Sequence, residues 1–185
     1  MIEHAALPEI KPIWRLSGDT FTLPGFNHDP LTLFKNFAYS GKIDRADEDG
    51  SAEDPEWQHL LDAWLTGVRL QCPSFMDAVS DVLVSKLPGG TFNGSLSAEL
   101  LAAAGPRSPM RELLVEIVAF KWTEKSFKSK NMQFNDADIF RKALVRMGES
   151  KSWHGSKKKA QLEKQLDCSY HSHGMHGELC YRKMR

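Results

Sequence analysis

The chain has 185 residues, of which 41% are hydrophobic and 26% are charged, and its formal net charge is zero. This composition is typical of a globular protein with one core, and it excludes a disordered or fibrous chain. No stretch approaches the roughly 18 apolar residues of a membrane span, and the N-terminus lacks the basic start and apolar core of a signal peptide. Three cysteines are too few for a disulfide scaffold, so we expect an intracellular protein of the nucleus or the cytoplasm.

The net charge of zero hides a division between the two parts of the chain. Residues 1–120 carry 9 Lys/Arg and 17 Asp/Glu, whereas residues 121–185 carry 15 and 7. One interpretation is two surfaces of opposite sign that attract one another. The other is a basic tail that binds nucleic acid or an acidic partner, although the aromatic residues that would strengthen it are not interleaved with the basic ones.

The first part of the chain predicts a short strand followed by a helix. Residues 1–19 are mostly polar and punctuated by proline, so we expect an irregular lead-in. The alternating run 20–23 is β-prone and predicts one brief strand. Asp29 is the expected N-cap of a helix that Gly41 ends. The apolar residues of this helix recur at helical spacing: Leu31, Phe34, Phe37 and Ala38.

Residues 44–56 hold seven acidic side chains and no apolar residue larger than alanine. Such a segment has nothing to bury, so we expect a solvated, disordered loop. An acidic loop that docks a partner is the alternative.

Residues 55–87 predict two helices joined by a short connection at Cys72-Pro73, and we take this pair as the centre of the fold. Apolar residues recur at steps of three and four in each half, and a proline precedes each of them. A connection this short favours an antiparallel hairpin. The apolar positions are Trp57, Leu60, Leu61, Trp64, Leu65 and Val68 in the first half, and Phe75, Met76, Val79, Val82 and Leu83 in the second.

Three further helices are expected after the hairpin. Leu96, Leu100 and Leu101 suggest a short one, Ser108-Pro109 opens a stronger one that runs to Trp122, and Asn135-Asp136 caps one that Gly148 ends. The apolar residues of the last helix are Ile139, Phe140, Leu144 and Met147. We therefore predict a mainly α protein, an antiparallel helical hairpin packed with further helices, with at most one or two short strands.

The C-terminus concentrates residues that can bind a metal ion. Cys168, His171, His173 and Cys180, together with His176, lie within thirteen positions. Zinc takes four nitrogen or sulfur ligands in a tetrahedron, and Cys-x2-His with a later cysteine supplies these atoms. The spacing matches no standard zinc finger. A structural zinc site and a polar, solvated tail that needs no cofactor are both consistent with it.

The sequence shows no pattern typical of an enzyme. It contains no G-x-S-x-G, no phosphate-binding glycine loop and no H-E-x-x-H. Cys72 lies at the start of a predicted helix, where the helix dipole can lower the pKa of a thiol, but no base is placed beside it. We expect no catalytic residues, and we interpret Cys72 as a small buried apolar side chain.

Several strings, taken in order, resemble a BTB/POZ domain. FTLPGFNHDPLTLFKNFAYSGKI resembles its late strand and "D-P-x-x-F" helix, and LLDAWLTGVRLQCPSFMDAVSDVLVSKL resembles its closing helix pair. The strings SPMRELLVEI and CSYHSH, with Cys180, are similar to the extension found in BTB domain-containing proteins of filamentous fungi.

The resemblance implies four segments. They are the lead-in 1–19, an incomplete BTB/POZ-like domain at 20–87, a helical extension at 88–150, and a basic Cys/His-containing tail at 151–185. Residues 1–19 supply no counterpart of the strand pair and helix that open a complete BTB domain. Because that half carries much of the homodimer surface of the family, homodimerisation is not implied here. We expect the apolar residues Ile13, Trp14 and Leu16 to cover part of the hairpin instead.

The resemblance implies a non-enzymatic protein-interaction module, adaptor-like in a ubiquitin ligase or in transcription, with a BTB-type or cullin-type scaffold as partner. The corresponding surface lies at the exit of the first helix, at Phe37, Tyr39, Lys42 and Ile43. Ordinary packing of these residues is an equal interpretation. The alternative function is a metal-stabilised nucleic-acid-binding protein that uses the basic half.

Overall fold

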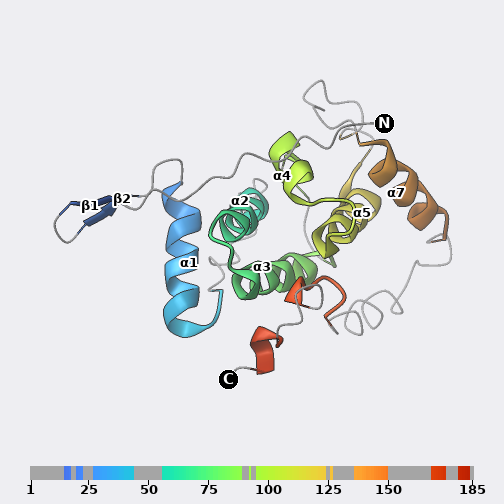
Figure 1. Ribbon diagram of the computed structural model, residues 1–185. Coiled ribbons are helices and arrows are strands. Elements are labelled where there is room, and N and C mark those ends of the chain that lie inside the picture. Colours follow the sequence, from blue (N-terminus) through green and yellow to red (C-terminus); the bar gives the residue numbers. More distant parts are fainter. Residues whose placement is uncertain are drawn as a thin grey trace.

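The computed structural model describes residues 15–17, 20–22, 27–43, 56–88, 92, 95–123, 126, 136–149, 168–173 and 179–183. This part of the chain is mainly helical, as the sequence predicts (Figure 1). Its elements, in chain order, are β1 (Arg15–Ser17), β2 (Thr20–Thr22), α1 (His28–Ser40), α2 (Glu56–Arg69), α3 (Pro73–Lys86), α4 (Ala98–Ala103), α5 (Pro109–Lys121), α7 (Ala137–Glu149) and the 3-10 helix η2 (Tyr181–Lys183).

Helices α2 and α3 follow one another after a short connection and pack together at the centre of the structure, as predicted for the hairpin (Figure 1). Every apolar position predicted for it is buried or packed against the core. The two helices approach closely at Gly67, where an added Cβ would lie 2.7 Å from Cγ of Met76. Pro73 occupies the first turn of α3, where its missing N–H has no helical partner to lose.

Helix α1 packs on this hairpin as its third partner. The rings of Phe34 and Phe37 lie 5.2 and 5.4 Å from the ring of Phe75, centroid to centroid, and such edge-on or tilted pairs add to the burial energy of each ring. The N-cap is Asn27 rather than the expected Asp29, which lies inside the first turn. Gly41 ends the helix in the left-handed conformation, with φ of 66°.

Helix α5 packs against α3, and its apolar side chains complete the core. Helix α4 is the short helix expected there, and Leu100 is its buried residue. In α7, Asp136 caps the first turn as expected, because its carboxylate accepts from the N–H of Ile139. Leu144 was expected on the apolar face but is 63% exposed, since Ala143 takes the buried position instead.

Ion pairs join α5 to α7. The guanidinium of Arg111 donates twice to Asp136, at 2.7 and 2.6 Å, and its side chain is only 9% exposed. Lys142 pairs with Glu112 at 2.6 Å, and Arg146 pairs with Glu116 at 3.3 Å. In the pairs formed by Lys142 and Arg146, a cation of the basic part meets a carboxylate of the acidic part, as one interpretation of the charge division expects. The pair of Arg111 with Asp136 has the opposite sense, with its cation in the acidic part.

Strands β1 and β2 form an antiparallel pair with Leu16 opposite Phe21. The predicted strand is confirmed at Thr20–Thr22, but β1 lies within the lead-in that was expected to be irregular. The alternation of three residues is too short a pattern to reveal such a strand.

Other predictions fall outside the described residues. These are the acidic loop up to residue 55, the basic tail up to residue 167, and the contacts of Ile13, Trp14 and the Leu16 side chain. Among the helices that the structure describes, none combines the length and the apolar character needed to cross a bilayer.

Replacing Gly67 by alanine should destabilise the protein. The new Cβ would lie 2.7 Å from Cγ of Met76 and 3.2 Å from Cδ1 of Phe75, so these side chains or the two helices must shift. Overpacking of this kind costs about 1–3 kcal/mol, which outweighs the gain of about 1 kcal/mol in helix propensity. Urea unfolding measures the difference.

The matched control is Gly148→Ala in α7, where an added Cβ meets nothing within 4 Å. This variant should stabilise the protein or leave it unchanged. Equal effects of the two substitutions would show that the close approach of α2 and α3 is not a constraint.

Candidate metal centre

Two short pieces of the C-terminal segment, 168–173 and 179–183, lie against α3 (Figure 1). They bring together the side chains of Cys168, His171, His173 and Cys180, whose ligand-type atoms all lie within 4.8 Å of one another. These are the four residues proposed from the sequence, and the group could hold a metal ion. His176, the remaining histidine of the sequence cluster, lies outside the described residues.

The two thiols face each other. The sulfur atoms of Cys168 and Cys180 are 3.8 Å apart, so they are not joined by a disulfide, and Nδ1 of His171 lies 3.7 Å from the Cys180 sulfur. Cys180 and His171 are buried, with exposed fractions of 5% and 4%. These two residues of the cluster therefore lie within the protein. For the described residues, the interpretation of the C-terminus as a polar, solvated tail is wrong.

Asp77 of α3 holds the first of the two pieces. Its carboxylate is 1% exposed and accepts from the backbone N–H of Ser172 at 2.5 Å and from the Ser172 hydroxyl at 2.8 Å. Nδ1 of His173 lies 2.8 Å from the other carboxylate oxygen. A buried charge is tolerated when donors compensate the loss of hydration, and here the C-terminal segment supplies them.

Asp81, one helical turn further along α3, joins both pieces. Nε2 of His171 lies 2.7 Å from its carboxylate, Nε of Arg182 donates to it at 2.9 Å, and the hydroxyl of Tyr181 donates to it as well. Burial would raise the pKa of Asp81, but the hydrogen bonds from His171, Arg182 and Tyr181 outweigh it, so this pKa is lowered. The carboxylate is therefore ionised at neutral pH.

The environment of Asp81 also acts on its neighbours. Burial disfavours the imidazolium form of His171, yet the hydrogen bond to Asp81 raises the pKa of His171 above its ordinary value. Burial raises the pKa of the Cys168 thiol. For Cys180, burial acts in the same direction, but hydrogen bonds from the Arg182 backbone and His171 lower the pKa of the thiol. Cys180 thus carries negative charge more readily than Cys168.

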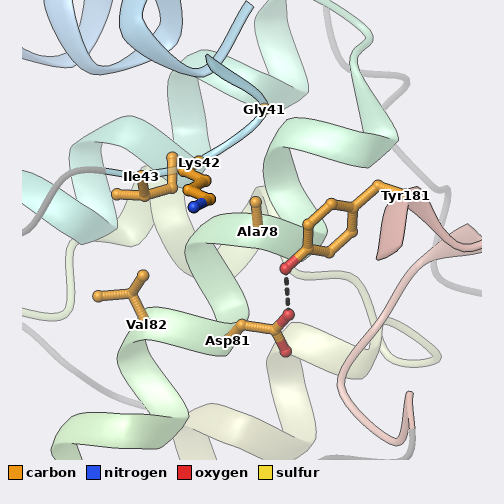
Figure 2. Close-up of a pocket in the computed structure, with 7 residues that line it drawn as sticks. All are labelled: Gly41, Lys42, Ile43, Ala78, Asp81, Val82 and Tyr181. Carbon is orange, nitrogen blue, oxygen red and sulfur yellow. Dashed lines mark hydrogen bonds between the residues drawn. The ribbon is translucent and has the colours of Figure 1, made fainter. Parts of the chain in front are cut away.

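Beside this centre lies an open pocket of about 320 Å3. Figure 2 shows Tyr181 and Asp81 on one side of it, with Lys42 and Ile43 on the other. The remaining lining residues are Gly41, Ala78 and Val82. One wall is therefore the exit of α1, and the other is formed by α3 and the docked C-terminal segment.

The four residues proposed for partner binding are separated by the structure. Lys42 and Ile43 line the pocket, and Tyr39 is 86% exposed close to it in the chain. Phe37 is partly buried, with its ring 5.4 Å from Phe75 and 6.1 Å from Tyr181. Phe37 therefore packs the interior, and Ile43 also packs in part against the core while it lines the pocket. Tyr39 and Lys42 are exposed.

The sequence analysis missed the roles of Asp77 and Asp81. Both belong to a helix whose neighbouring positions Phe75, Val79 and Val82 are apolar. Carboxylates four residues apart on a largely apolar helix are the signal that could have revealed them, since a buried charge needs a partner from elsewhere in the chain. Cys72 is the N-cap residue of α3 and packs in part against the core, in line with its interpretation as an apolar side chain.

A scan against protein-family models, a search of curated proteins and a search of solved structures each found no match to this chain. The resemblance to a BTB/POZ domain therefore stays a prediction from the strings quoted above.

Replacing Asp77 by alanine should release the first C-terminal piece from α3. The N–H and hydroxyl of Ser172 and the ring of His173 would lose their acceptor, and each buried donor left without one costs about 1–3 kcal/mol. Hydrogen–deuterium exchange should become faster at residues 168–173 while the α2–α3 hairpin stays protected.

The matched control is Asp62→Ala in α2, where the carboxylate accepts from Gln58 of the same helix. Exchange at 168–173 should not change in this variant. If Asp77→Ala also left exchange there unchanged, the carboxylate would not be what holds the segment.

Proposed function

We propose that this chain is a non-enzymatic protein-interaction module that binds a protein partner at the pocket between the exit of α1 and η2. The observation that supports the proposal most directly is the pocket itself. Lys42 and Ile43, two of the four residues proposed for partner binding, line it. By the BTB/POZ resemblance the partner is a BTB-type or cullin-type scaffold, and the role is that of an adaptor in a ubiquitin ligase or in transcription.

The chemistry of this surface suits recognition of a protein. Tyr39 offers a large aromatic side chain that is 86% exposed, and aromatic residues are enriched among those that dominate binding energy at interfaces. Val82 and Ile43 give the pocket an apolar part, and Lys42 adds a positive charge at its edge. An apolar centre with a polar rim is the usual anatomy of an interface.

Most cations of the basic half lie outside the described residues, and those that the structure describes do not favour the alternative function of nucleic-acid binding. In the described part of residues 121–185, four cations pair with carboxylates: Arg141 with Asp138, Lys142 with Glu112, Arg146 with Glu116, and Arg182 with Asp81. A cation that neutralises a carboxylate of its own chain contributes less to counterion release from a phosphate backbone. We therefore rank the interaction module first.

The test uses the purified full chain and biolayer interferometry against a purified cullin N-terminal domain and a purified BTB domain. Tyr39→Ala and Lys42→Glu should weaken binding at least about tenfold, because they remove the aromatic anchor and reverse the rim charge. Leu144→Ala is the control, since Leu144 is also an exposed apolar residue but lies on α7.

The proposal is contradicted if neither scaffold binds, or if the two pocket variants bind as the unmodified chain does. Binding of duplex DNA or of RNA that falls steeply with salt would favour the alternative instead.

A further inference from the structure

We propose that Cys168, His171, His173 and Cys180 form a structural zinc site, with both thiolate sulfurs, Nδ1 of His171 and Nε2 of His173 as the four ligand atoms. The inference stands on the geometry of the C-terminal segment and does not depend on the identity of any protein partner. A site with four protein ligands is closed to substrate, so its role is structural rather than catalytic.

Two distances between ligand atoms match the edges of a zinc tetrahedron. Zinc binds cysteine sulfur at about 2.3 Å and histidine nitrogen at about 2.0–2.1 Å, so the edges of a tetrahedral site are about 3.8 Å between two sulfurs and about 3.6 Å between sulfur and nitrogen. The sulfurs of Cys168 and Cys180 are 3.8 Å apart, and the Cys180 sulfur is 3.7 Å from Nδ1 of His171. One ligand-type atom of each of the four residues lies within 4.8 Å of those of the others, so the remaining edges would have to shorten when an ion binds.

Each histidine has a carboxylate behind it on the side away from the cluster. Asp81 lies 2.7 Å from Nε2 of His171, which leaves Nδ1 free, and Asp77 lies 2.8 Å from Nδ1 of His173, which leaves Nε2 free. A ligand histidine in a zinc site usually donates its second ring N–H to a carboxylate, which fixes the tautomer and the direction of the ring. Here the arrangement occurs twice, once with each ring nitrogen.

The backbone also directs the ligands. Cys168 has φ of 59°, a left-handed conformation that few non-glycine residues adopt, and its carbonyl oxygen accepts from the N–H of His171. This turn places a thiol and an imidazole on the same side of the chain. Cys180 begins the last described turn, where its carbonyl oxygen accepts from the N–H of Lys183. The left-handed conformation of Cys168 is strained, and strain of this kind persists where surrounding interactions hold it.

The donor set selects the metal. Two thiolates and two imidazoles in a tetrahedral arrangement suit zinc, whereas magnesium and calcium prefer oxygen ligands. Two thiolates would balance the charge of Zn2+, so the ion adds no net charge to a buried place that already holds the carboxylates of Asp77 and Asp81.

A different use of the same atoms is a cysteine nucleophile, because Cys180, His171 and Asp81 lie in a line of hydrogen-bonded pairs. A nucleophile of this type has no use for a second thiol at 3.8 Å or for a second imidazole backed by its own carboxylate. The sulfur of Cys180 is also buried. Zinc accounts for all four donors, and the nucleophile accounts for only two.

The proposal is tested first on the full chain itself. Protein purified with Zn2+ and dialysed against metal-free buffer should retain one zinc per chain by elemental analysis. After chelation, Co2+ should give the visible bands of a tetrahedral ion together with a sulfur-to-cobalt charge-transfer band. Chelation should also speed proteolysis within 168–183, and added Zn2+ should restore resistance.

Variants then assign the ligands. Cys168→Ser and Cys180→Ser should each abolish zinc retention, whereas the matched controls Cys72→Ser and His59→Ala should retain one zinc per chain. Circular dichroism shows whether the variants keep the helical fold. Because a misfolded variant would also lose zinc, the measurements on the unmodified chain decide.

A folded, unmodified chain that retains no zinc and gives no tetrahedral cobalt spectrum overturns the proposal. So does alkylation of Cys180 that is as fast with zinc as after chelation, since a bound thiolate should be protected. That second outcome would favour a reactive cysteine. Binding of a protein partner affects neither measurement, so this test fails or succeeds independently of the proposed function.

Discussion

Asp77 and Asp81 place two carboxylates one turn apart on α3, the helix that the core surrounds, and Asp77 is 1% exposed. Removing a carboxylate from water is costly unless donors replace the lost hydration. Both residues obtain these donors from positions 90 or more residues later in the chain. The contact between α3 and the C-terminal segment is thus required by α3 itself, and the positions of the thiols, the imidazoles and η2 depend on it.

This contact links the proposed zinc site to the proposed binding surface. Asp81 accepts from His171 on the metal side. On the pocket side it accepts from Tyr181 (Figure 2). A zinc ion that ties 168–173 to 179–183 would fix Tyr181 as one wall of the pocket, opposite Lys42 and Ile43. In that case the surface that a partner meets is assembled from the exit of α1 and the C-terminal segment, and α3 holds them together.

The helices could be predicted from the sequence because their apolar spacing is a local property. Trp57, Phe75 and Leu83 were placed in the core by steps of three and four, and each is buried. The composition of the C-terminus likewise identified the four possible ligands before any geometry was known. The sequence could not show which carboxylates the histidine rings contact, since Ser172 and His173 reach Asp77 across 95 and 96 residues. No periodicity within a short window reports such a contact.

The differences from prediction have the same physical origin. Leu144 fits the helical stripe of α7 by spacing, but the packing of α7 against α5 buries Ala143 and leaves Leu144 at the surface. Phe37 lies at the exit of α1, where a surface role was expected, yet it fills the space between Phe75 and Tyr181. In both cases the neighbouring element determines which face is buried, and spacing alone does not identify that neighbour.

The most direct measurement is the X-ray absorption fine structure at the zinc edge of the full chain. The account predicts a first coordination shell of two sulfurs at about 2.3 Å and two nitrogens at about 2.0–2.1 Å, with the outer-shell scattering of imidazole. A shell of nitrogen and oxygen alone, or of four sulfurs, would contradict it. The Cys/His cluster that packs against α3 supplies two sulfurs and two nitrogens.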